Sequence, residues 1–261
     1  MGKRILRHLC TLVAVAALGA AAYLGSELVK KELEYKKGQD QLQDIYAVME
    51  YVEERVEAER PEGTEQQPEV NRLIQYQVLR EQNDDMVGWI QIEGTQVAYP
   101  VMYTPDDPEF YMNHGFDKKY SSYGMIFIDA NCAPDSGCTN TLIYGHHMRN
   151  GDMFASIENY DDPAYFKAHP YIEYDTLEEL GVYQVIAAFK RPAASLDQNF
   201  MEMILARTEE DYQNLMSSIR QWRFYDTGVV SEWGDTLITL ATCEYTQGDG
   251  RFFVVAKKVS E

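Results

Sequence analysis

The chain has 261 residues, enough for one full-sized hydrophobic core and an additional N-terminal extension. Its formal net charge of −19 argues against nucleic-acid binding, which needs a basic face, and against broad adsorption to anionic lipid. Beyond these exclusions the acidic composition indicates only a soluble body.

The N-terminal segment, residues 1–31, places several cations ahead of an apolar run over about 9–24. This run is near the lower length limit of a membrane-spanning helix and is long for the core of a signal peptide. The alanines at 20–22 offer a cleavage site, so a removed signal is the alternative to an uncleaved anchor. We expect the anchor to be retained because the helical pattern continues past it. The cations then predict a single-pass cell-membrane protein with a cytoplasmic N-terminus and an extracellular body.

Residues 32–70 are charged and rich in helix-forming residues, and they form the predicted stalk or linker. One apolar stripe at helical spacing indicates a helix that packs on its own domain or acts as a stalk, rather than one that binds a partner. Prolines between 61 and 68 end this helix, and a second helix is expected over 71–82. The globular domain is predicted to extend over 71–261.

From residue 86 the period of the apolar residues changes from helical to alternating, which is typical of strands. There is no alternation of strands with crossover helices and no internal repeat. A mainly β fold follows, an eight-stranded closed barrel with peripheral helices, because closure removes exposed strand edges. The expected strands are 86–94, 95–103, 123–130, 139–145, 171–176, 180–190, 236–242 and 251–259, with helices at 162–169 and 208–222.

The chemistry-bearing residues gather at two strand ends. Cys243 ends an apolar strand beside a Gly/Asp turn, and Arg251 opens the next strand eight residues later. His146 and His147 follow another strand end, at 139–145. Attack by a cysteine on an acyl group needs a thiolate, a proton-handling partner and a donor for the oxyanion. Cys243, one of these histidines and Arg251 match those three needs.

Two motifs in this order resemble a known family. Residues 239–243 read TLATC, similar to the TLxTC signature of sortases, the cysteine transpeptidases of Gram-positive cell surfaces. The segment 144–154, YGHHMRNGDMF, is similar to the histidine segment of class B sortases. Residues 71–259 fit the family in order. The resemblance implies the sortase barrel, with a class B helix in the long loop of 190–235.

The resemblance also assigns roles to residues. Cys243 is implied as the nucleophile and His146 as its proton-transfer partner, because the family places the functional ring directly after the glycine. His147 is then expected to be a surface or supporting residue. Arg251 is implied to hold the substrate and to stabilise the tetrahedral intermediate. The residues implied to line the substrate groove are Tyr144, Thr242 and Glu244.

The implied reaction is two acyl transfers without a metal or organic cofactor. Cys243 attacks the Thr carbonyl of an NPxTN-like C-terminal sorting signal on a surface protein and forms a thioester. An amine of a peptidoglycan cross-bridge, of a lipid-linked precursor or of another protein's lysine then resolves it. The segment DPEFYM at 107–112 departs from the DNxYYL-like pattern of better-known class B members, so their peptide preference does not transfer directly.

Other interpretations make different predictions. A papain-type hydrolase has its cysteine near the mature N-terminus and its histidine downstream, whereas His146 precedes Cys243. A non-catalytic surface-anchored binding module has no need of the Cys, His and Arg together. A class B enzyme that polymerises pilins through a lysine nucleophile stays open. His114 is a candidate base by residue type alone, since no Gly-flanked strand end precedes it.

Cys132 and Cys138 flank the loop-like stretch APDSG. Outside the membrane a disulfide between them and two separate loop thiols are equally expected. Their spacing is not that of a zinc site, and no neighbouring histidine completes one.

Overall fold

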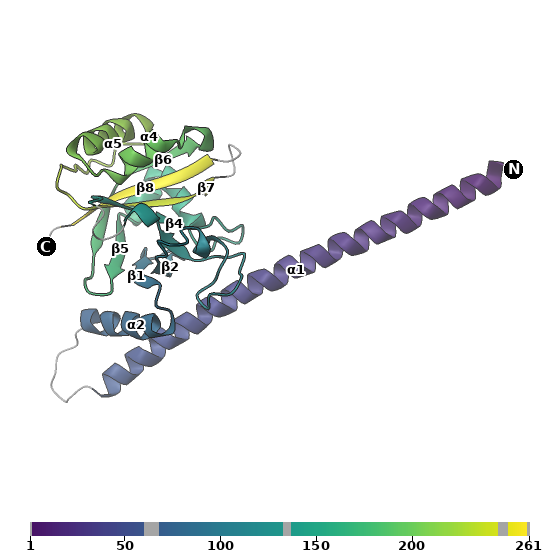
Figure 1. Cartoon of the computed structure of the whole chain (residues 1–261), viewed down its shortest axis with the longest axis horizontal. Helices are drawn as coiled ribbons and strands as arrows, with labels where there is room; N and C mark the ends of the chain where they lie inside the picture. Colours follow the sequence, from purple (N-terminus) through teal and green to yellow (C-terminus); the bar gives the residue numbers. More distant parts are fainter. Residues whose placement is uncertain (1, 60–67, 133–136, 245–249, 260–261) are drawn as a thin grey trace.

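The alternating apolar segments form eight strands that close into a barrel (Figure 1). The computed structural model describes residues 2–59, 68–132, 137–244 and 250–259. The strands neighbour one another in the order β1-β2-β3-β4-β7-β8-β6-β5, which confirms the predicted mainly β, closed eight-stranded fold. Their bounds are β1 Met86–Gln91, β2 Ala98–Met102, β3 Ile126–Ile128, β4 Asn140–Tyr144, β5 Tyr171–Thr176, β6 Val182–Pro192, β7 Leu237–Glu244 and β8 Gly250–Lys258.

Helices surround the barrel and extend from it. The loop between β6 and β7 holds two α-helices, α4 and α5, where one was expected, and both lie over one side of the barrel (Figure 1). Side chains cap their N-termini, with Asp197 accepting from Phe200 N and Thr208 accepting from Asp211 N. The helix bounds are α1 Gly2–Ala58, α2 Pro68–Gln82, α3 Pro163–Ala168, α4 Gln198–Leu205 and α5 Glu209–Trp222, with short 3₁₀ turns η1 Phe110–Met112, η2 Ala130–Cys132, η3 Ala155–Asp161 and η4 Ala193–Ser195.

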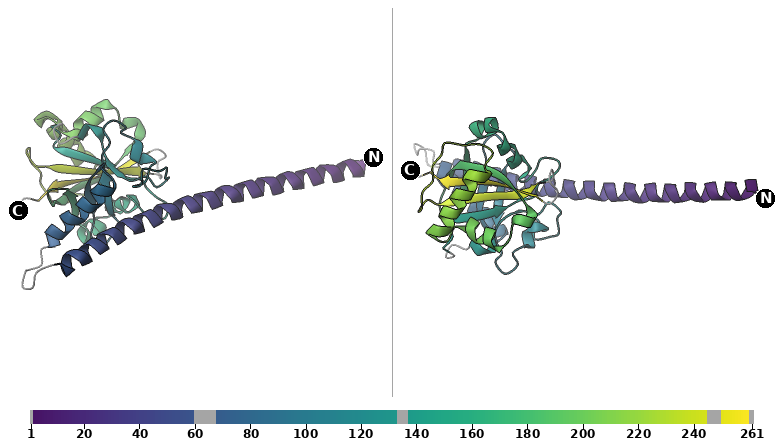
Figure 2. Two further views of the ribbon diagram at one scale, coloured as in Figure 1. Left: turned by 60° about the horizontal axis from the view of Figure 1, so that its bottom comes forward. Right: turned by 90° about the horizontal axis from the view of Figure 1, so that it is seen from above.

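The long helix α1 has two parts with different surroundings. Its first part leaves the barrel as a single rod (Figure 2), and it contains an 18-residue window of mean hydropathy 1.8 in which no residue is buried. By length and composition this helix could cross a membrane. In its second part the predicted apolar stripe packs on the barrel, with Leu42, Ile45 and Val52 buried. The predicted stalk is therefore largely a helix packed on its own domain.

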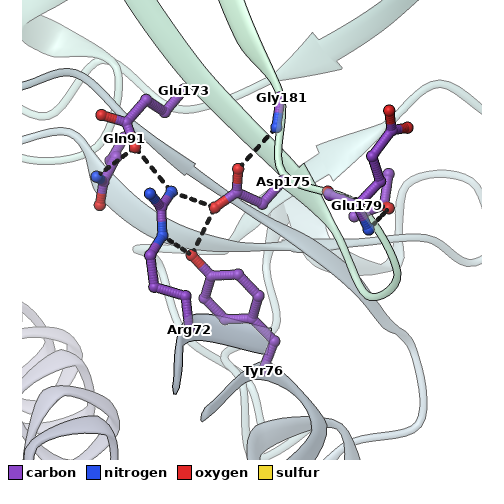
Figure 3. A network of polar contacts seen from close by, with 8 residues as sticks. Arg72, Tyr76, Gln91, Glu173, Asp175, Glu179 and Gly181 are labelled. Carbon is purple, nitrogen blue, oxygen red and sulfur yellow. Dashed lines mark hydrogen bonds and ion pairs between the residues drawn. The ribbon is translucent and has the colours of Figure 1, made fainter. Parts of the chain in front are cut away.

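Helix α2 is held to the barrel by a buried polar network (Figure 3). Asp175 on β5 is 1% exposed, accepts a hydrogen bond from Tyr76 Oη at 2.7 Å and forms an ion pair with Arg72. The other oxygen of Asp175 accepts from Gly181 N at 3.0 Å, and Arg72 also contacts Glu173 at 2.7 Å. Because each oxygen of the buried carboxylate has a donor, the network joins α2 to the β5–β6 hairpin without an unpaired charge.

The pairing of three strands positions the candidate site. Strand β7 lies between β4, to which it is parallel, and β8, to which it is antiparallel. Tyr144 at the end of β4 is in register with Ala241, and Gly145 N extends the ladder by donating to Ala241 O at 3.1 Å. The carboxyl ends of β4 and β7, each followed by candidate residues, therefore lie side by side.

A buried pair of polar side chains fixes this register. Asn140 on β4 and Thr239 on β7 are both fully buried. Asn140 Nδ2 donates to Thr239 Oγ1 at 2.8 Å and to Ile204 O of α4 at 2.6 Å, and Thr239 Oγ1 donates to Asn140 Oδ1 at 3.0 Å. A shift of the two strands by one residue would leave these groups unpaired in the core, which is costly. The first threonine of TLATC thus has a structural role.

We predict that Thr239→Val, which leaves the side-chain volume nearly unchanged, destabilises the fold. The loss leaves the buried Asn140 amide partly unsatisfied, at a cost of about 1–3 kcal/mol. For a domain of this size the melting temperature should fall by roughly 3–8 °C in a thermal melt. Thr141→Val, on the half-buried neighbour of Asn140, is the matched control and should melt within about 2 °C of wild type. Equal melting of the two variants would contradict the structural role of Thr239.

Candidate active site

A groove of about 390 Å³ opens at the carboxyl ends of β4 and β7. Four of the residues singled out from the sequence line it together: Tyr144, His146, Thr242 and Arg251. The apolar part of its lining comes from β3, β4, β8 and α4, and its acidic side chains are Glu109 and Asp129. The fold therefore brings residues more than a hundred positions apart into one cavity.

Cys243 enters the site through its backbone register. It is the Cα partner of Arg251 across β7 and β8, and it follows Ala241 by two residues. Because Ala241 is in register with Tyr144, Cys243 and His146 are each two residues beyond a paired position on parallel neighbours. This places the two chain segments side by side at the groove. The side chains of Cys243 and Glu244 lie outside the part of the chain that the structure describes.

The ring of His146 is held on one side by the segment around η1. Its Nε2 lies 2.5 Å from Met112 O, and a carbonyl can only accept, so Nε2 carries a hydrogen and donates. In the neutral ring the lone pair is then on Nδ1, the nitrogen available for a proton from a thiol. A methyl group on Gly124 would come within 3.0 Å of His146 Cδ2, which shows how closely the backbone packs on the ring.

The glycine before this histidine is required by packing. A Cβ on Gly145 would approach Ile126 Cδ1 to 2.5 Å and the ring of Phe154 to 2.6 Å. Beyond it, Phe154 N donates to His146 O at 2.8 Å and closes the loop. The Gly-His pair of the motif thus lets the strand end lie tightly on the core while the imidazole reaches the groove.

His147 points to another part of the surface. Its Nε2 forms an ion pair with Glu158 Oε2 of η3 at 3.1 Å, and its backbone bridges to Met153. It lines a separate cavity of about 480 Å³ and not the groove. His114 stacks on Phe110 with ring centroids 3.9 Å apart and also lies away from the groove lining. His146 is therefore the histidine that the fold presents to the groove.

Tyr144 is fixed beside Arg251. Its hydroxyl donates to Asp129 Oδ2 at 3.0 Å, and burial raises its pKa well above the ordinary value, so the group stays neutral. Arg251 is half-buried and donates from Nη1 to Gly250 O at 3.0 Å, which leaves other donors of its fork toward the groove. Thr242 is 2% exposed, and among the described residues its Oγ1 has no hydrogen-bond partner. Such a hydroxyl can serve a bound molecule.

Part of the groove lining was not identified from the sequence. The irregular segment 104–122 supplies Pro108, Glu109 and Met112, and α4 with its approach supplies Leu196, Phe200 and Met201. Neither segment has a periodic sequence pattern that ties it to the site. Three residues of DPEFYM, Pro108, Glu109 and Met112, therefore form part of the groove wall.

The structure has Cys132 and Cys138 as thiols, and a disulfide between them in the exported protein stays a prediction. Cys132 is 8% exposed rather than a surface loop residue, with its sulfur 3.3 Å from Leu142 N and 3.6 Å from Asn140 O. Burial raises the pKa of the Cys132 thiol to about 12. Cys138 Sγ donates to Asn131 O at 3.1 Å. These contacts with the backbone orient each sulfur as a thiol beneath the groove wall.

Within the described ranges, no group of three or more His, Cys, Asp or Glu side chains is placed to hold a metal ion.

Comparison with known proteins agrees on one family. Residues 90–259 match the family model described as a sortase domain. Sortase B of Listeria monocytogenes is 30% identical over 186 residues, covering 70% of this chain and 73% of the relative.

Solved structures give the same relationship. A cysteine-to-serine mutant form of Clostridium perfringens sortase B superposes with a TM-score of 0.67 at 27% identity, covering 74% of this chain and 91% of that one. A Staphylococcus aureus sortase B–substrate complex has a TM-score of 0.63 at 29% identity, covering 72% and 85%.

We predict that His146, and not His147, controls the reactivity of Cys243. A neighbouring imidazolium stabilises a thiolate, so His146→Gln should slow alkylation of Cys243 by iodoacetamide at pH 7 by at least about tenfold. His147→Gln is the matched control and should stay within about threefold of wild type. Peptide mapping by mass spectrometry separates Cys243 from the other cysteines. The opposite ranking of the two variants would assign the role to His147.

Proposed function

This chain belongs to the sortase family, in its class B, and is a cysteine transpeptidase of cell-wall sorting; from that premise we propose its substrates and the roles of its residues. It cleaves an NPxTN-like C-terminal sorting signal after Thr and transfers the surface protein to a cell-wall amine. The observation that carries this proposal is the convergence of His146, Thr242 and Arg251 in one groove, with Cys243 paired to Arg251 in the strand register.

In the first step Cys243 attacks the Thr carbonyl carbon of the bound signal. The thiol gives its proton to His146 Nδ1, the nitrogen that the contact with Met112 O leaves with the lone pair. The carbon–sulfur bond forms as the peptide C–N bond breaks. His146 then returns the proton to the leaving amine, and a thioester remains on Cys243.

Arg251 stabilises the negative oxygen that develops on the carbonyl. Its guanidinium is always charged and presents several N–H donors in fixed geometry, and it lines the groove from β8 opposite Cys243 in the register. In this proposal the donors of Arg251 other than the one bonded to Gly250 O bind the oxyanion and the peptide backbone. The half-buried position strengthens each of these hydrogen bonds compared with solvent.

The peptide lies along the apolar lining of the groove. An uncharged signal such as Asn-Pro-x-Thr-Asn suits the mixture of apolar walls with the hydroxyl of Thr242 and the ring of Tyr144. The structure of a relative in complex with a substrate supports peptide binding in this family. Glu109 and Asp129 line the same groove, so a cationic residue at the variable position x is favoured electrostatically.

We expect Arg251→Lys to show whether geometry or charge matters. Loss of one oxyanion donor costs about 10²–10³ in rate, and a lysine cannot reproduce the fork of donors. Thioester formation with an NPxTN-like peptide should fall by that factor in single-turnover trapping, with Cys243→Ala as the blank. Arg191→Lys is the matched control, because Arg191 is the register partner of Arg251 on β6 and its guanidinium stacks on Trp222. Wild-type trapping by Arg251→Lys would mean that charge alone suffices.

We also propose that α1 anchors the enzyme in the cell membrane, with the N-terminus cytoplasmic and the barrel outside. The support is the exposed apolar window of α1, which continues without a break into the part that packs on the barrel. Intact-mass measurement of the membrane fraction should give a chain that retains residues 1–31. A mature chain that starts near Tyr23 would instead mean that a signal peptide is removed.

A further inference from the structure

Helix α1 is seated against the catalytic domain next to the histidine segment. Gly38 lies so close to Tyr123 that a Cβ on the glycine would be 2.4 Å from Tyr123 Cγ. One turn earlier, Tyr35 packs edge-on against the same ring, with centroids 5.8 Å apart. Tyr123 is 1% exposed, so the helix covers it completely. A contact this close places α1 at a defined distance from the barrel.

Polar contacts extend this seat to both loops around His146. Tyr123 Oη donates to Asp152 Oδ2 at 2.5 Å, and Gln39 Nε2 of α1 donates to the same carboxylate at 3.3 Å. On the other loop, Phe116 N donates to Gln41 Oε1 at 3.1 Å. The helix that leaves the proposed membrane span is therefore fixed against the two segments that flank the catalytic ring.

A third cavity, of about 240 Å³, lies between α1 and the histidine segment. Three residues of α1 form one wall, Lys31, Glu34 and Tyr35, and the opposite wall is Ser122 with residues 146–149. His146 lines both this cavity and the peptide groove. The imidazole thus borders both spaces, and the peptide groove is the one proposed to hold the acyl group.

The lining of this cavity beside α1 carries groups that suit a particular ligand. Glu34 is anionic, whereas Lys31 and Arg149 are cationic, and all three are exposed toward solvent. Ser122 Oγ is buried, and in the described part of the chain it has no hydrogen-bond partner. The charged groups are therefore the part of this lining that a ligand can reach. Opposite charges match a peptide that carries both an ammonium and a carboxylate.

We propose that this cavity is the acceptor site, in which α1 binds the amine-bearing peptide that resolves the thioester. The inference rests on the proposed function and adds the place of the second substrate. The sorting peptide fills the groove on one side of His146, so the acceptor approaches from the other side. Glu34 attracts its ammonium group, and Lys31 with Arg149 binds its carboxylate.

The transfer step uses this arrangement. The ammonium first releases one proton to solvent, and the neutral amine attacks the thioester carbonyl carbon. The new C–N bond forms and the C–S bond breaks. A proton of the attacking nitrogen passes to His146, and Cys243 leaves as a thiolate. The imidazolium and thiolate are then ready for the next sorting signal.

The position of the cavity along α1 indicates how far from the membrane the acceptor would bind. Lys31 and Glu34 are seven and ten residues beyond Leu24, the end of the apolar run, which corresponds to about 10–15 Å at the rise of an α-helix. With α1 as the anchor, the cavity lies just outside the headgroup layer, which is roughly 5–8 Å thick on each side of the bilayer. An acceptor tethered to a membrane lipid can reach it at the membrane surface.

The experiment measures how the thioester divides between an amine and water. The full-length chain in detergent micelles is given an NPxTN-like peptide together with triglycine, and the ratio of transfer to hydrolysis is determined within each variant. Glu34→Gln should lower this ratio about fivefold, as expected for the loss of one ion pair near the surface. Glu32→Gln is the matched control, because Glu32 is an exposed glutamate of α1 outside the cavity lining, and it should keep the wild-type ratio.

Two further acceptors separate binding from chemistry. Hydroxylamine is small and uncharged at pH 7, so its transfer ratio should be the same in Glu34→Gln and wild type. Triglycine amide has no carboxylate, so Lys31→Gln with Arg149→Gln should lower transfer to triglycine but not to its amide. If Glu34→Gln matches Glu32→Gln, or if hydroxylamine transfer falls equally, the acceptor site is wrong. If the wild type forms no thioester at all, the proposed function fails and the acceptor site fails with it.

Discussion

The parallel pairing of β4 with β7 is the constraint on which the rest of the site depends. Neither strand carries the whole reaction, since the histidine follows one and the cysteine ends the other. Their register decides whether the two side chains meet, and a parallel pair has no connecting turn that could fix it locally. The buried hydrogen bonds between Asn140 and Thr239 supply that information from inside the core. The TLATC motif therefore contains both Cys243, the proposed nucleophile, and Thr239, which aligns β7 with the strand that precedes His146.

The imidazole of His146 borders both the peptide groove and the cavity beside α1. Among the described residues, a backbone carbonyl and closely packed glycines hold the ring of His146, whereas many hydrolytic triads use a carboxylate. The orientation of the ring therefore depends on the backbone around it. In the proposed reaction His146 handles the proton in acylation and in transfer, so both halves would depend on the position of this one ring.

Much of the fold and the central residues could be predicted from the sequence. Alternating apolar residues indicated all eight strands, and the cap at Thr208 marked the start of α5, because both signals are local. The groove wall from 104–122 could not be predicted, because its apolar residues follow no periodic pattern. These residues reach the groove only when the chain has folded. Cys132 was expected in a loop and lies in the core. The residues around it have a loop-like sequence, and its burial comes from β4, which covers the sulfur only in the folded chain.

The contact of Gly38 with Tyr123 has a consequence for how the enzyme searches for its partners. Helix α1 has 57 residues, about 85 Å at the rise of an α-helix, and no break separates its apolar part from the part seated on the barrel. A flexible tether would let the domain sample a hemisphere above the membrane. With α1 as the proposed membrane anchor, a rigid helix restricts the domain to rotation and lateral diffusion at one height, so the volume that it shares with other membrane-bound molecules is a thin layer. Their effective concentration rises accordingly, without any increase in intrinsic affinity.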